Sequence, residues 1–593
     1  MSLLEAKVQQ WLAWDRDPVT RQAVASLAAK GDTAELQRRL GKRMKFDTAG
    51  LRSTMGAGNA HMNRLTVLQT AQGLVAYIKQ EFSPAEHSRG VVVGYDGRHH
   101  SREFGERIAT VLHQQGIKTY FYRRCVPTPF VPYAIGFFKA LAGVMVTASH
   151  NPKEYNGIKV YWSNGAQIVA PHDTSIAACI EANLTPLEPS WAPFTAADHT
   201  DPYDAVFKDF FSTLRSSYTP ASDASTVRFT YTAMHGVGTP FVTYGLGQVL
   251  GLPASHLSVV TEQAEPNPDF PTVRYPNPEE GRAAFALSFE TADRYGASVV
   301  MANDPDADRL AVAERLPDGE GWHVFTGNEI GALLGWWAIE RARRQGVAFD
   351  RCLLISTVVS SCILKTMAAK EGVQYSETLT GFKFMGNKAM ECKAKEGLQT
   401  LFAYEEAIGF MWGERVMDKD GVTAAVVLAD LACYLRKERQ CSLLEHLQSL
   451  YQRYGYHFTN NSYMATDDPA KTVALLQSIR TAASGRYPTR IAGRQVIRVV
   501  DFAAQVDTAA PSGRPSLGQT SMITFHVEGG MRITIRGSGT EPKIKWYAEL
   551  VTKDAAGQRS LNAFVAQAVR QLMQPHKFGL VMRSEDAVLF SKL

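Results

Sequence analysis

The feature that most constrains the fold is an alternation of short apolar runs with longer amphipathic segments, which restarts along the chain. In the first unit, 90–97 and 144–146 are predicted strands and 101–116 is a predicted helix. The same alternation restarts near residue 227 and again near residue 327. Because such alternation is typical of layered α/β domains, the sequence predicts three similar α/β units.

The two ends of the chain have a different pattern. Residues 1–45 read as amphipathic helices broken at Gly31-Asp32, and beyond about residue 456 the predicted strands cluster between two helices. A chain of 593 residues is also too long for one hydrophobic core. We therefore predict an N-terminal helical segment (1–45), three α/β domains (46–215, 216–325 and 326–457) and a C-terminal α+β domain (458–593).

Composition narrows the functional classes. The net charge of +5 suits anionic small molecules, but no block of Lys and Arg indicates nucleic acid binding. No apolar run reaches the ~18 residues of a membrane span, and the N-terminus lacks the apolar region of a signal peptide. The seven scattered cysteines have no CxxC spacing, which predicts reduced thiols in an intracellular protein.

The chain closes on Ser591-Lys592-Leu593, a tripeptide that import receptors read as a peroxisomal address. We expect localisation to a peroxisome-type organelle, which in some protists is the glycosome. A coincidental match, with a cytoplasmic protein, is the alternative.

The run Thr147-Ala-Ser-His-Asn-Pro152 follows the predicted strand 144–146. Ligands bind at the carboxyl ends of strands in α/β sheets, so Ser149 beside His150 is well placed for nucleophilic chemistry. The simpler alternative is a serine that only satisfies turn hydrogen bonds. Lys159 lies within the next apolar strand, either as an inward functional group or as a solvated residue of an edge strand.

The loop Asn303-Asp-Pro-Asp-Ala-Asp-Arg309 follows another predicted strand, 298–301. Its three carboxylates repel each other unless a cation lies between them. Oxygen ligands indicate Mg²⁺, with Mn²⁺ or Ca²⁺ as alternatives, and an EF-hand is excluded because Arg309 occupies the position of its glycine. A solvated acidic turn is the simpler alternative.

Two further regions carry polar groups suited to phosphate and sugar. In Arg536-Gly-Ser-Gly-Thr-Glu-Pro-Lys543, backbone amides, hydroxyls and a guanidinium can surround an anion, although a plain Gly-Ser turn is the alternative. A predicted loop at 378–386 precedes Glu405 and Glu406, which can accept sugar hydroxyls or begin a helix. A serine nucleophile, a metal site and a phosphate-binding loop together indicate phosphoryl transfer.

Five motifs stand in one order along the chain: TASHNP (147–152), NDPDADR (303–309), TGFKF (380–384), YEEAIG (404–409) and RGSGTEPK (536–543). In these the chain resembles the α-D-phosphohexomutase superfamily, most closely its phosphoglucomutase-2/phosphopentomutase branch. The resemblance implies a four-domain α/β architecture around a central cleft, in which each domain supplies one loop.

The resemblance also implies residue roles. Ser149 would carry the phosphoryl group, and one Mg²⁺ per subunit would bind Ser149, Asp304, Asp306 and Asp308. The implied catalytic residues are Arg52, Ser149, His150, Lys159, Arg309 and Lys383, with Lys159 or His150 as acid and base. The implied sugar-binding residues are Gly381, Phe382, Lys383, Glu405 and Glu406. The implied phosphate-binding residues are Arg536, Ser538, Gly539, Thr540 and Lys543.

The activity implied is a phosphosugar mutase that interconverts sugar 1- and 6-phosphates, or pentose 1- and 5-phosphates, through a phosphoserine and a sugar bisphosphate. A sugar 1,6-bisphosphate would act as activator, and the protein would be a monomer or weak dimer. Ala407 replaces a serine found in many hexose enzymes, so pentose phosphates are candidates. The alternatives are a glucose 1,6-bisphosphate synthase and a non-catalytic phosphosugar-binding protein.

Overall fold

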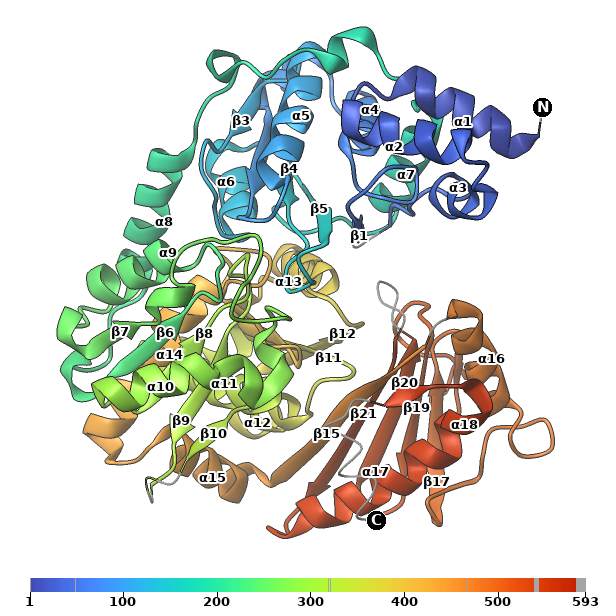
Figure 1. Cartoon of the computed structure of the whole chain (residues 1–593). Helices are drawn as coiled ribbons and strands as arrows, with labels where there is room; N and C mark the ends of the chain where they lie inside the picture. The colour runs from blue at the N-terminus through green and yellow to red at the C-terminus, as the bar shows by residue number, and fades with distance from the viewer. Residues whose placement is uncertain are drawn as a thin grey trace.

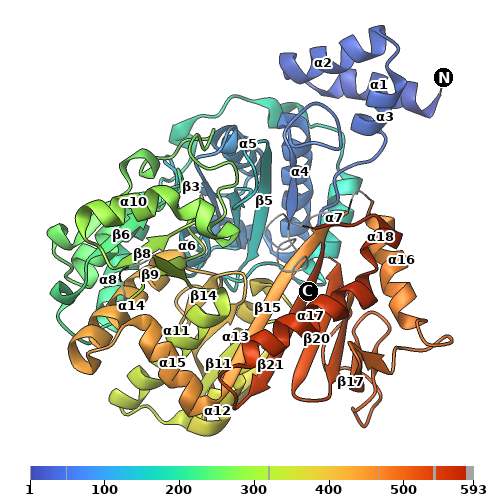
Figure 2. The ribbon, with the colours of Figure 1, turned by 60° about the horizontal axis from the view of Figure 1, so that its bottom comes forward.

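The computed structural model describes residues 2–47, 50–317, 319, 321–466, 468–537 and 543–582. Three sheets of four or five strands and one larger C-terminal sheet follow each other along the chain. Figure 1 shows them as an arc that runs from the N-terminal helices to the C-terminal sheet, and Figure 2 shows the same elements from a second side. The predicted α/β fold class is confirmed.

The N-terminal segment forms a small helical layer of its own. The predicted break at Gly31-Asp32 separates two of its helices, and a further break lies at Asp17, whose side chain caps the helix that begins at Pro18. One residue from each of the three helices, Trp11, Val24 and Leu36, contributes to their shared hydrophobic core. Its helices are α1 (Leu3–Trp14), α2 (Pro18–Ala29) and α3 (Thr33–Leu40).

The first sheet has the order β1-β5-β4-β2-β3, with β2, β3 and β4 parallel and β5 antiparallel to both of its neighbours. Alternate residues of β4 serve two cores: Val144 and Val146 join the core that includes residues of α4, α5 and α7, whereas Met145 joins the core that includes residues of α6. The strands are β1 (Leu51–Thr54), β2 (Val91–Tyr95), β3 (Thr119–Phe121), β4 (Ala142–Val146) and β5 (Tyr155–Trp162). The helices are α4 (Arg64–Glu81), α5 (Ser101–Gln114), α6 (Phe130–Phe138) and α7 (His172–Ala182).

The second sheet has the order β10-β9-β8-β6-β7 and resembles the first in having parallel strands followed by an antiparallel return. Its strands are β6 (Phe229–Thr232), β7 (Leu257–Val259), β8 (Val299–Ala302), β9 (Ala311–Arg315) and β10 (Trp322–Val324). The helices around it are α8 (Tyr203–Ser217), α9 (Thr239–Tyr244) and α10 (Ala286–Tyr295).

The third sheet, of order β12-β11-β13-β14, corrects one prediction. The segment 378–386 is not wholly a loop, because helix α13 begins at Phe382 directly after Gly381, whose φ is 116°. Gly386 lies inside this helix, and only glycine fits there because a Cβ would come within 2.2 Å of the Met417 carbonyl oxygen. The strands are β11 (Cys352–Thr357), β12 (Gln374–Thr378), β13 (Gln399–Glu405) and β14 (Gly409–Trp412). The helices are α11 (Gly327–Arg344), α12 (Ile363–Glu371), α13 (Phe382–Glu396), α14 (Gly421–Tyr434) and α15 (Leu443–Tyr454).

The C-terminal domain is an antiparallel sheet with helices packed on one face, where Leu475, Phe564 and Ile533 share a core. Its ten-residue strand β15 was missed by the sequence analysis, because Thr459–Ser462 interrupt any apolar alternation, yet it pairs with β21 along its whole length. The strands are β15 (Tyr456–Ala465), β16 (Arg490–Ile491), β17 (Arg494–Asp501), β18 (Val506–Asp507), β19 (Met522–Val527), β20 (Met531–Gly537), β21 (Lys543–Thr552) and β22 (Val581–Met582). The helices are α16 (Pro469–Arg480), α17 (Gly557–Met573) and α18 (Pro575–Phe578).

Two further expectations concern the whole chain. All seven cysteines are unpaired in the structure. Among the helices that the structure describes, none combines the length and the apolar character needed to cross a bilayer.

Candidate active site

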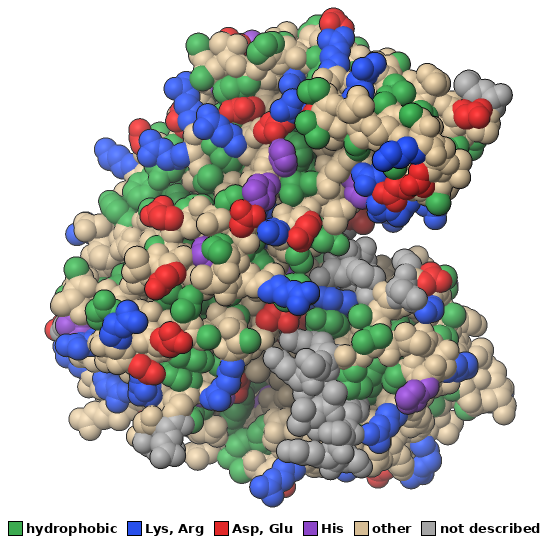
Figure 3. Space-filling model, viewed as in Figure 1, with side chains coloured by type: hydrophobic (Ala, Val, Ile, Leu, Met, Phe, Trp, Pro, Cys, Tyr) green, Lys and Arg blue, Asp and Glu red, His purple; other side chains and the backbone are tan. Residues whose placement is uncertain are grey.

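The face of the molecule is hollowed between the first domain and the last, and charged side chains gather at the base of the hollow (Figure 3). A cavity of about 230 Å³ lies there, with walls from all four domains. It brings together most of the predicted site residues: Arg52, Ser149, His150, Lys159, Asp308, Arg309, Gly381, Phe382, Lys383, Glu405, Glu406 and Arg536. The roles assigned to them stay predictions, but their convergence is a structural fact.

Ser149 lies directly after β4, in a left-handed backbone conformation with a φ of 53°. This conformation is uncommon for a residue other than glycine and is held by its surroundings. The Ser149 amide donates to Thr147 Oγ1 at 2.8 Å, and Thr147 in turn donates to Asp96. The Ser149 hydroxyl donates to Asp304 Oδ2 at 2.8 Å, which joins the first domain to the second.

A buried arginine that the sequence analysis missed fixes the serine loop. The Arg98 guanidinium donates to the carbonyl oxygens of Ser149, Asn151 (2.7 Å) and Pro152 (3.0 Å). Its ion-pair partner is Asp96, whose carboxylate also lies beneath the loop. The argument used for Ser149 could have found this pair, since Asp96 and Arg98 follow β2, the strand beside β4.

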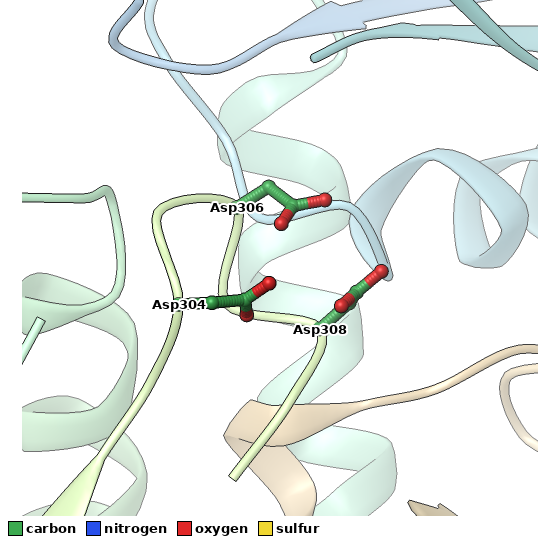
Figure 4. A group of neighbouring side chains, drawn as sticks. All are labelled: Asp304, Asp306 and Asp308. Carbon is green, nitrogen blue, oxygen red and sulfur yellow. The ribbon is translucent and has the colours of Figure 1, made fainter. Parts of the chain in front are cut away.

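The three aspartates of the loop after β8 are completely buried, so the solvated acidic turn is wrong. Their carboxylate oxygens lie within 4.8 Å of one another, and Figure 4 shows the side chains projecting toward a common space. Asp306 Oδ1 and Asp308 Oδ1 are buried without a hydrogen-bond partner among the described residues. Two unsatisfied anionic oxygens in an all-oxygen cluster fit a hard divalent cation.

Electrostatics strengthen the same conclusion. Burial raises the pKa of Asp304, and the charges of Asp306 and Asp308 raise it further. Burial also opposes ionisation of Asp306, but the Lys159 ammonium outweighs it and lowers the pKa of that carboxyl. Because like charges this close cannot all ionise alone, the residues present would hold Mg²⁺ favourably.

Lys159 lies inside the site, so its interpretation as a solvated edge residue is wrong. It belongs to β5, which has β1 and β4 on either side, and its side chain is only 6% exposed. Its Nζ lies 2.7 Å from Asp306 Oδ2 and 2.7 Å from Asp308 Oδ2. Burial opposes the charge on Lys159, but the two carboxylates prevail and raise its pKa.

His150 is the second candidate proton carrier. Burial lowers its pKa well below the ordinary value, and the positive charges of Arg309 and Arg52 lower it further. Its Nδ1 lies 3.4 Å from the Ser149 hydroxyl oxygen. A neutral imidazole beside the Ser149 hydroxyl can accept a proton.

Glu405 and Glu406 form the opposite wall of the cavity. The alternative in which they begin a helix is wrong, because Glu405 ends β13 and the chain turns directly into β14 at Gly409. Burial raises the pKa of Glu405 to about 7, which the charge of Lys419 opposes. Lys419, which the sequence analysis missed, lines the cavity with its Nζ 3.5 Å from Asp308 Oδ2.

The phosphate-binding set is only partly described. Arg536 lines the cavity, and burial lowers the pKa of Lys383 nearby. Lys543 lines an adjoining chamber of about 700 Å³ rather than the cavity itself, whereas Lys545 lines both. Ser538, Gly539 and Thr540 lie outside the described residues.

The metal assignment predicts that Asp308→Asn weakens Mn²⁺ binding at least about tenfold, because the site loses a charged oxygen ligand. Titration followed by electron paramagnetic resonance measures this directly. The control is Asp350→Asn, an exposed aspartate elsewhere in the chain, which should bind Mn²⁺ like the unaltered protein. Equal affinity in both variants would contradict the assignment.

Comparison with known proteins gives the family. Models of the alpha/beta/alpha domains I, II and III of phosphoglucomutase/phosphomannomutase match residues 43–186, 207–319 and 326–454. A phosphopentomutase of Mus musculus is 42% identical over 98% of this chain and 96% of its own. A glucose 1,6-bisphosphate synthase of Homo sapiens is 40% identical over 98% of this chain and 96% of its own.

The solved structures agree on the fold. A putative phosphomannomutase of Thermus thermophilus superposes with a TM-score of 0.65 at 19% identity, over 89% of this chain and 99% of its own. An open form of the Paramecium phosphoglucomutase pp63/parafusin gives 0.62 at 18% identity, over 91% of this chain and 96% of its own. Since the domain matches cover most of the chain and the relatives nearly all of it, the chain belongs to the phosphoglucomutase/phosphomannomutase family and is a phosphosugar mutase.

Proposed function

We propose that this mutase interconverts pentose 1-phosphates and 5-phosphates, with glucose phosphates as poorer substrates. The observation that carries the proposal is the Ser149 hydroxyl, 2.8 Å from a buried carboxylate at the wall of a cavity that all four domains line. The preference for pentoses rests on phosphopentomutase and phosphoribomutase relatives at 34–42% identity. Ala407 supports it, because it removes one hydroxyl that a hexose could contact.

The first transfer moves the phosphoryl group from phospho-Ser149 to the free hydroxyl of the sugar phosphate. The serine O–P bond breaks and a sugar O–P bond forms. The hydroxyl proton passes to the neutral His150, and the charged Lys159 can give a proton to the departing serine oxygen; both residues line the cavity. Mg²⁺ bound by the three aspartates would offset negative charge on the phosphoryl oxygens. Arg309 also lies at this end of the cavity, paired with Glu279 at 2.8 Å.

The second transfer returns a phosphoryl group to Ser149 from the other end of the bisphosphate. For this the sugar must bind in two orientations, with Arg536 and Lys383 holding whichever phosphate does not react. A released bisphosphate can phosphorylate an empty Ser149, and we therefore propose that sugar bisphosphate activates the enzyme. Glu405 and Glu406 hold sugar hydroxyls in both orientations.

A second candidate activity is the synthesis of glucose 1,6-bisphosphate. It is supported by relatives of that name at 40% identity. Turnover of glucose 1-phosphate with 1,3-bisphosphoglycerate as phosphoryl donor, in the absence of added bisphosphate, would distinguish it from the mutase.

The covalent role predicts that Ser149→Ala abolishes turnover while sugar-phosphate binding persists, because only the phosphoryl acceptor is lost. Rates on ribose, deoxyribose, glucose and mannose 1-phosphates, measured side by side, test the sugar preference in the same assay. Ser212→Ala, at an exposed serine, is the control and should keep full activity. An active Ser149→Ala variant would refute the mechanism.

The raised pKa of Glu405, about 7, predicts a pH-dependent KM. Below pH 7 the carboxyl gains a proton and loses an acceptor for sugar hydroxyls, so KM should rise as the pH falls from about 8 to 6. The same shift costs folding stability as the pH rises from 4.5 toward 7, because the folded protein keeps a proton that the unfolded chain releases. In Glu405→Gln the KM should be high and flat across this range, whereas Glu391→Gln, an exposed control, should keep the wild-type profile.

We propose further that Ser591-Lys592-Leu593 directs the protein to a peroxisome-type organelle. These residues lie outside the described part of the structure. An amino-terminally tagged protein that lacks the tripeptide should become cytosolic under the microscope. Continued import of that variant would leave the tripeptide without a role.

A further inference from the structure

The C-terminal domain meets the third domain at a small interface with an apolar and a polar part. The apolar part is a cluster separate from the main cores, to which Val358, Val359 and Leu379 contribute from the third domain. Phe502, Met522 and Tyr547 contribute from the C-terminal sheet. Such a small apolar contact holds two domains together but does little to fix their relative orientation.

The polar part centres on an ion pair within the C-terminal sheet. Arg532 of β20 and Glu549 of β21 lie directly opposite each other, so their side chains share one face of the sheet. Arg532 Nη2 donates to Glu549 Oε2 at 2.9 Å, and the two side chains are only 14% and 4% exposed. Both side chains also reach across to the third domain.

Arg532 contacts the backbone that follows β11. Its guanidinium donates to the carbonyl oxygens of Val358 at 3.1 Å and Ser360 at 2.9 Å. A planar fork that bonds two carbonyls and a carboxylate at once tolerates little rotation. The arginine therefore fixes the direction in which the sheet meets the third domain.

Glu549 caps a helix of the other domain. Its Oε1 accepts from the Ser361 hydroxyl at 2.6 Å and from the Cys362 amide at 2.8 Å, at the start of α12. The N-cap residue of α12, Cys362, makes no capping bond with its own side chain. A carboxylate satisfies the free amides at a helix N-terminus and is favoured by the helix dipole.

This contact is linked to both ends of the substrate cavity. On the third domain, the Ser360 hydroxyl donates to Glu406 Oε2 at 3.2 Å and accepts from the Glu406 amide at 3.1 Å, while the carbonyl of the same residue accepts from Arg532. On the C-terminal sheet, Arg536 lies on the same strand as Arg532, four residues along, or about 13 Å at the usual rise. The carboxylate proposed to bind the sugar (Glu406) and the guanidinium proposed to bind phosphate (Arg536) are thus both connected to this interdomain contact.

We propose that Arg532 and Glu549 are positioning residues that set the separation between the sugar-binding Glu406 and the phosphate-binding Arg536. The inference deepens the proposed function and rests on it. A buried ion pair adds little net stability, because desolvation offsets its attraction, whereas its geometry is specific. The pair acts on substrate binding through the orientation of the C-terminal domain and touches no reacting atom.

The test is Glu549→Gln. A glutamine has one acceptor oxygen where Glu549 has two, so its NH2 group must face donors either at Arg532 or at the start of α12, and one side of the contact is lost. The KM for ribose 1-phosphate should rise at least about tenfold, and calorimetry should show the same loss in the affinity for ribose 1,5-bisphosphate. Hydrolysis of phospho-Ser149 by water should change less than twofold, because Ser149, Lys159 and the three aspartates lie in the first two domains, away from the substituted residue. General destabilisation would affect all three quantities together.

The matched control is Asp507→Asn. Asp507 is as buried as Glu549, at 3% exposure, and pairs with Arg498 at 2.6 Å within the C-terminal domain; among the described residues no hydrogen bond or ion pair joins it to the third domain. Its KM and bisphosphate affinity should stay within twofold of wild type. If Glu549→Gln does not fold, Ser361→Ala carries the test, since it removes the hydroxyl that donates to Glu549 and otherwise loses only a longer bond from the Ile363 amide, at 3.2 Å.

The coupling to the sugar carboxylate is tested by Ser360→Ala. If Ser360 and Glu549 act through the same interdomain contact, the effects of Ser360→Ala and Glu549→Gln on bisphosphate affinity should not add in the double variant. The proposal is overturned if Glu549→Gln or Ser361→Ala binds bisphosphate as tightly as Asp507→Asn. A wild-type protein that binds bisphosphate but shows no mutase activity would instead contradict the proposed function. The bisphosphate affinities of the variants would still test the positioning role of Arg532 and Glu549.

Discussion

The arrangement of the first two domains depends on the free-energy cost of burying three carboxylates together. The side chains of Asp304, Asp306 and Asp308 are fully buried, and charges so placed are costly unless neighbours compensate them. Much of that compensation comes from the first domain: the ammonium of Lys159, the hydroxyl of Ser149 and the hydroxyl of Thr128, which donates to Asp306 Oδ2. The electrostatic requirement of one loop thus holds two domains together and places the Ser149 hydroxyl beside the aspartates.

This dependence explains why the strand ends were the informative part of the sequence. A buried apolar strand followed at once by acids or by a serine can be recognised locally, and the loops at 147–152 and 303–309 were found in this way. Helix α13 and strand β15 could not be recognised locally. The former carries a glycine that only the backbone of Met417 explains, and the latter is a polar strand supported by its neighbour.

The candidate site was predictable to the extent that its residues stand in short motifs. Lys419 is an example of what was missed: in sequence it is one lysine between two aspartates, and only the fold brings it against Asp308 and Glu405. The contact between Glu549 and the start of α12 is a second example, because it joins residues 187 positions apart. Interactions of this kind depend on domain placement, which no local pattern encodes.

The distribution of apolar cores has a consequence for the catalytic cycle. One continuous core runs through the first three domains, whereas the C-terminal domain has its own and shares only a small cluster with the rest. If the C-terminal domain moves to admit substrate and release product, it therefore exposes little apolar surface to water. The hydrogen bond between Ser149 and Asp304 lies within the first two domains, so a movement of the C-terminal domain would leave it intact.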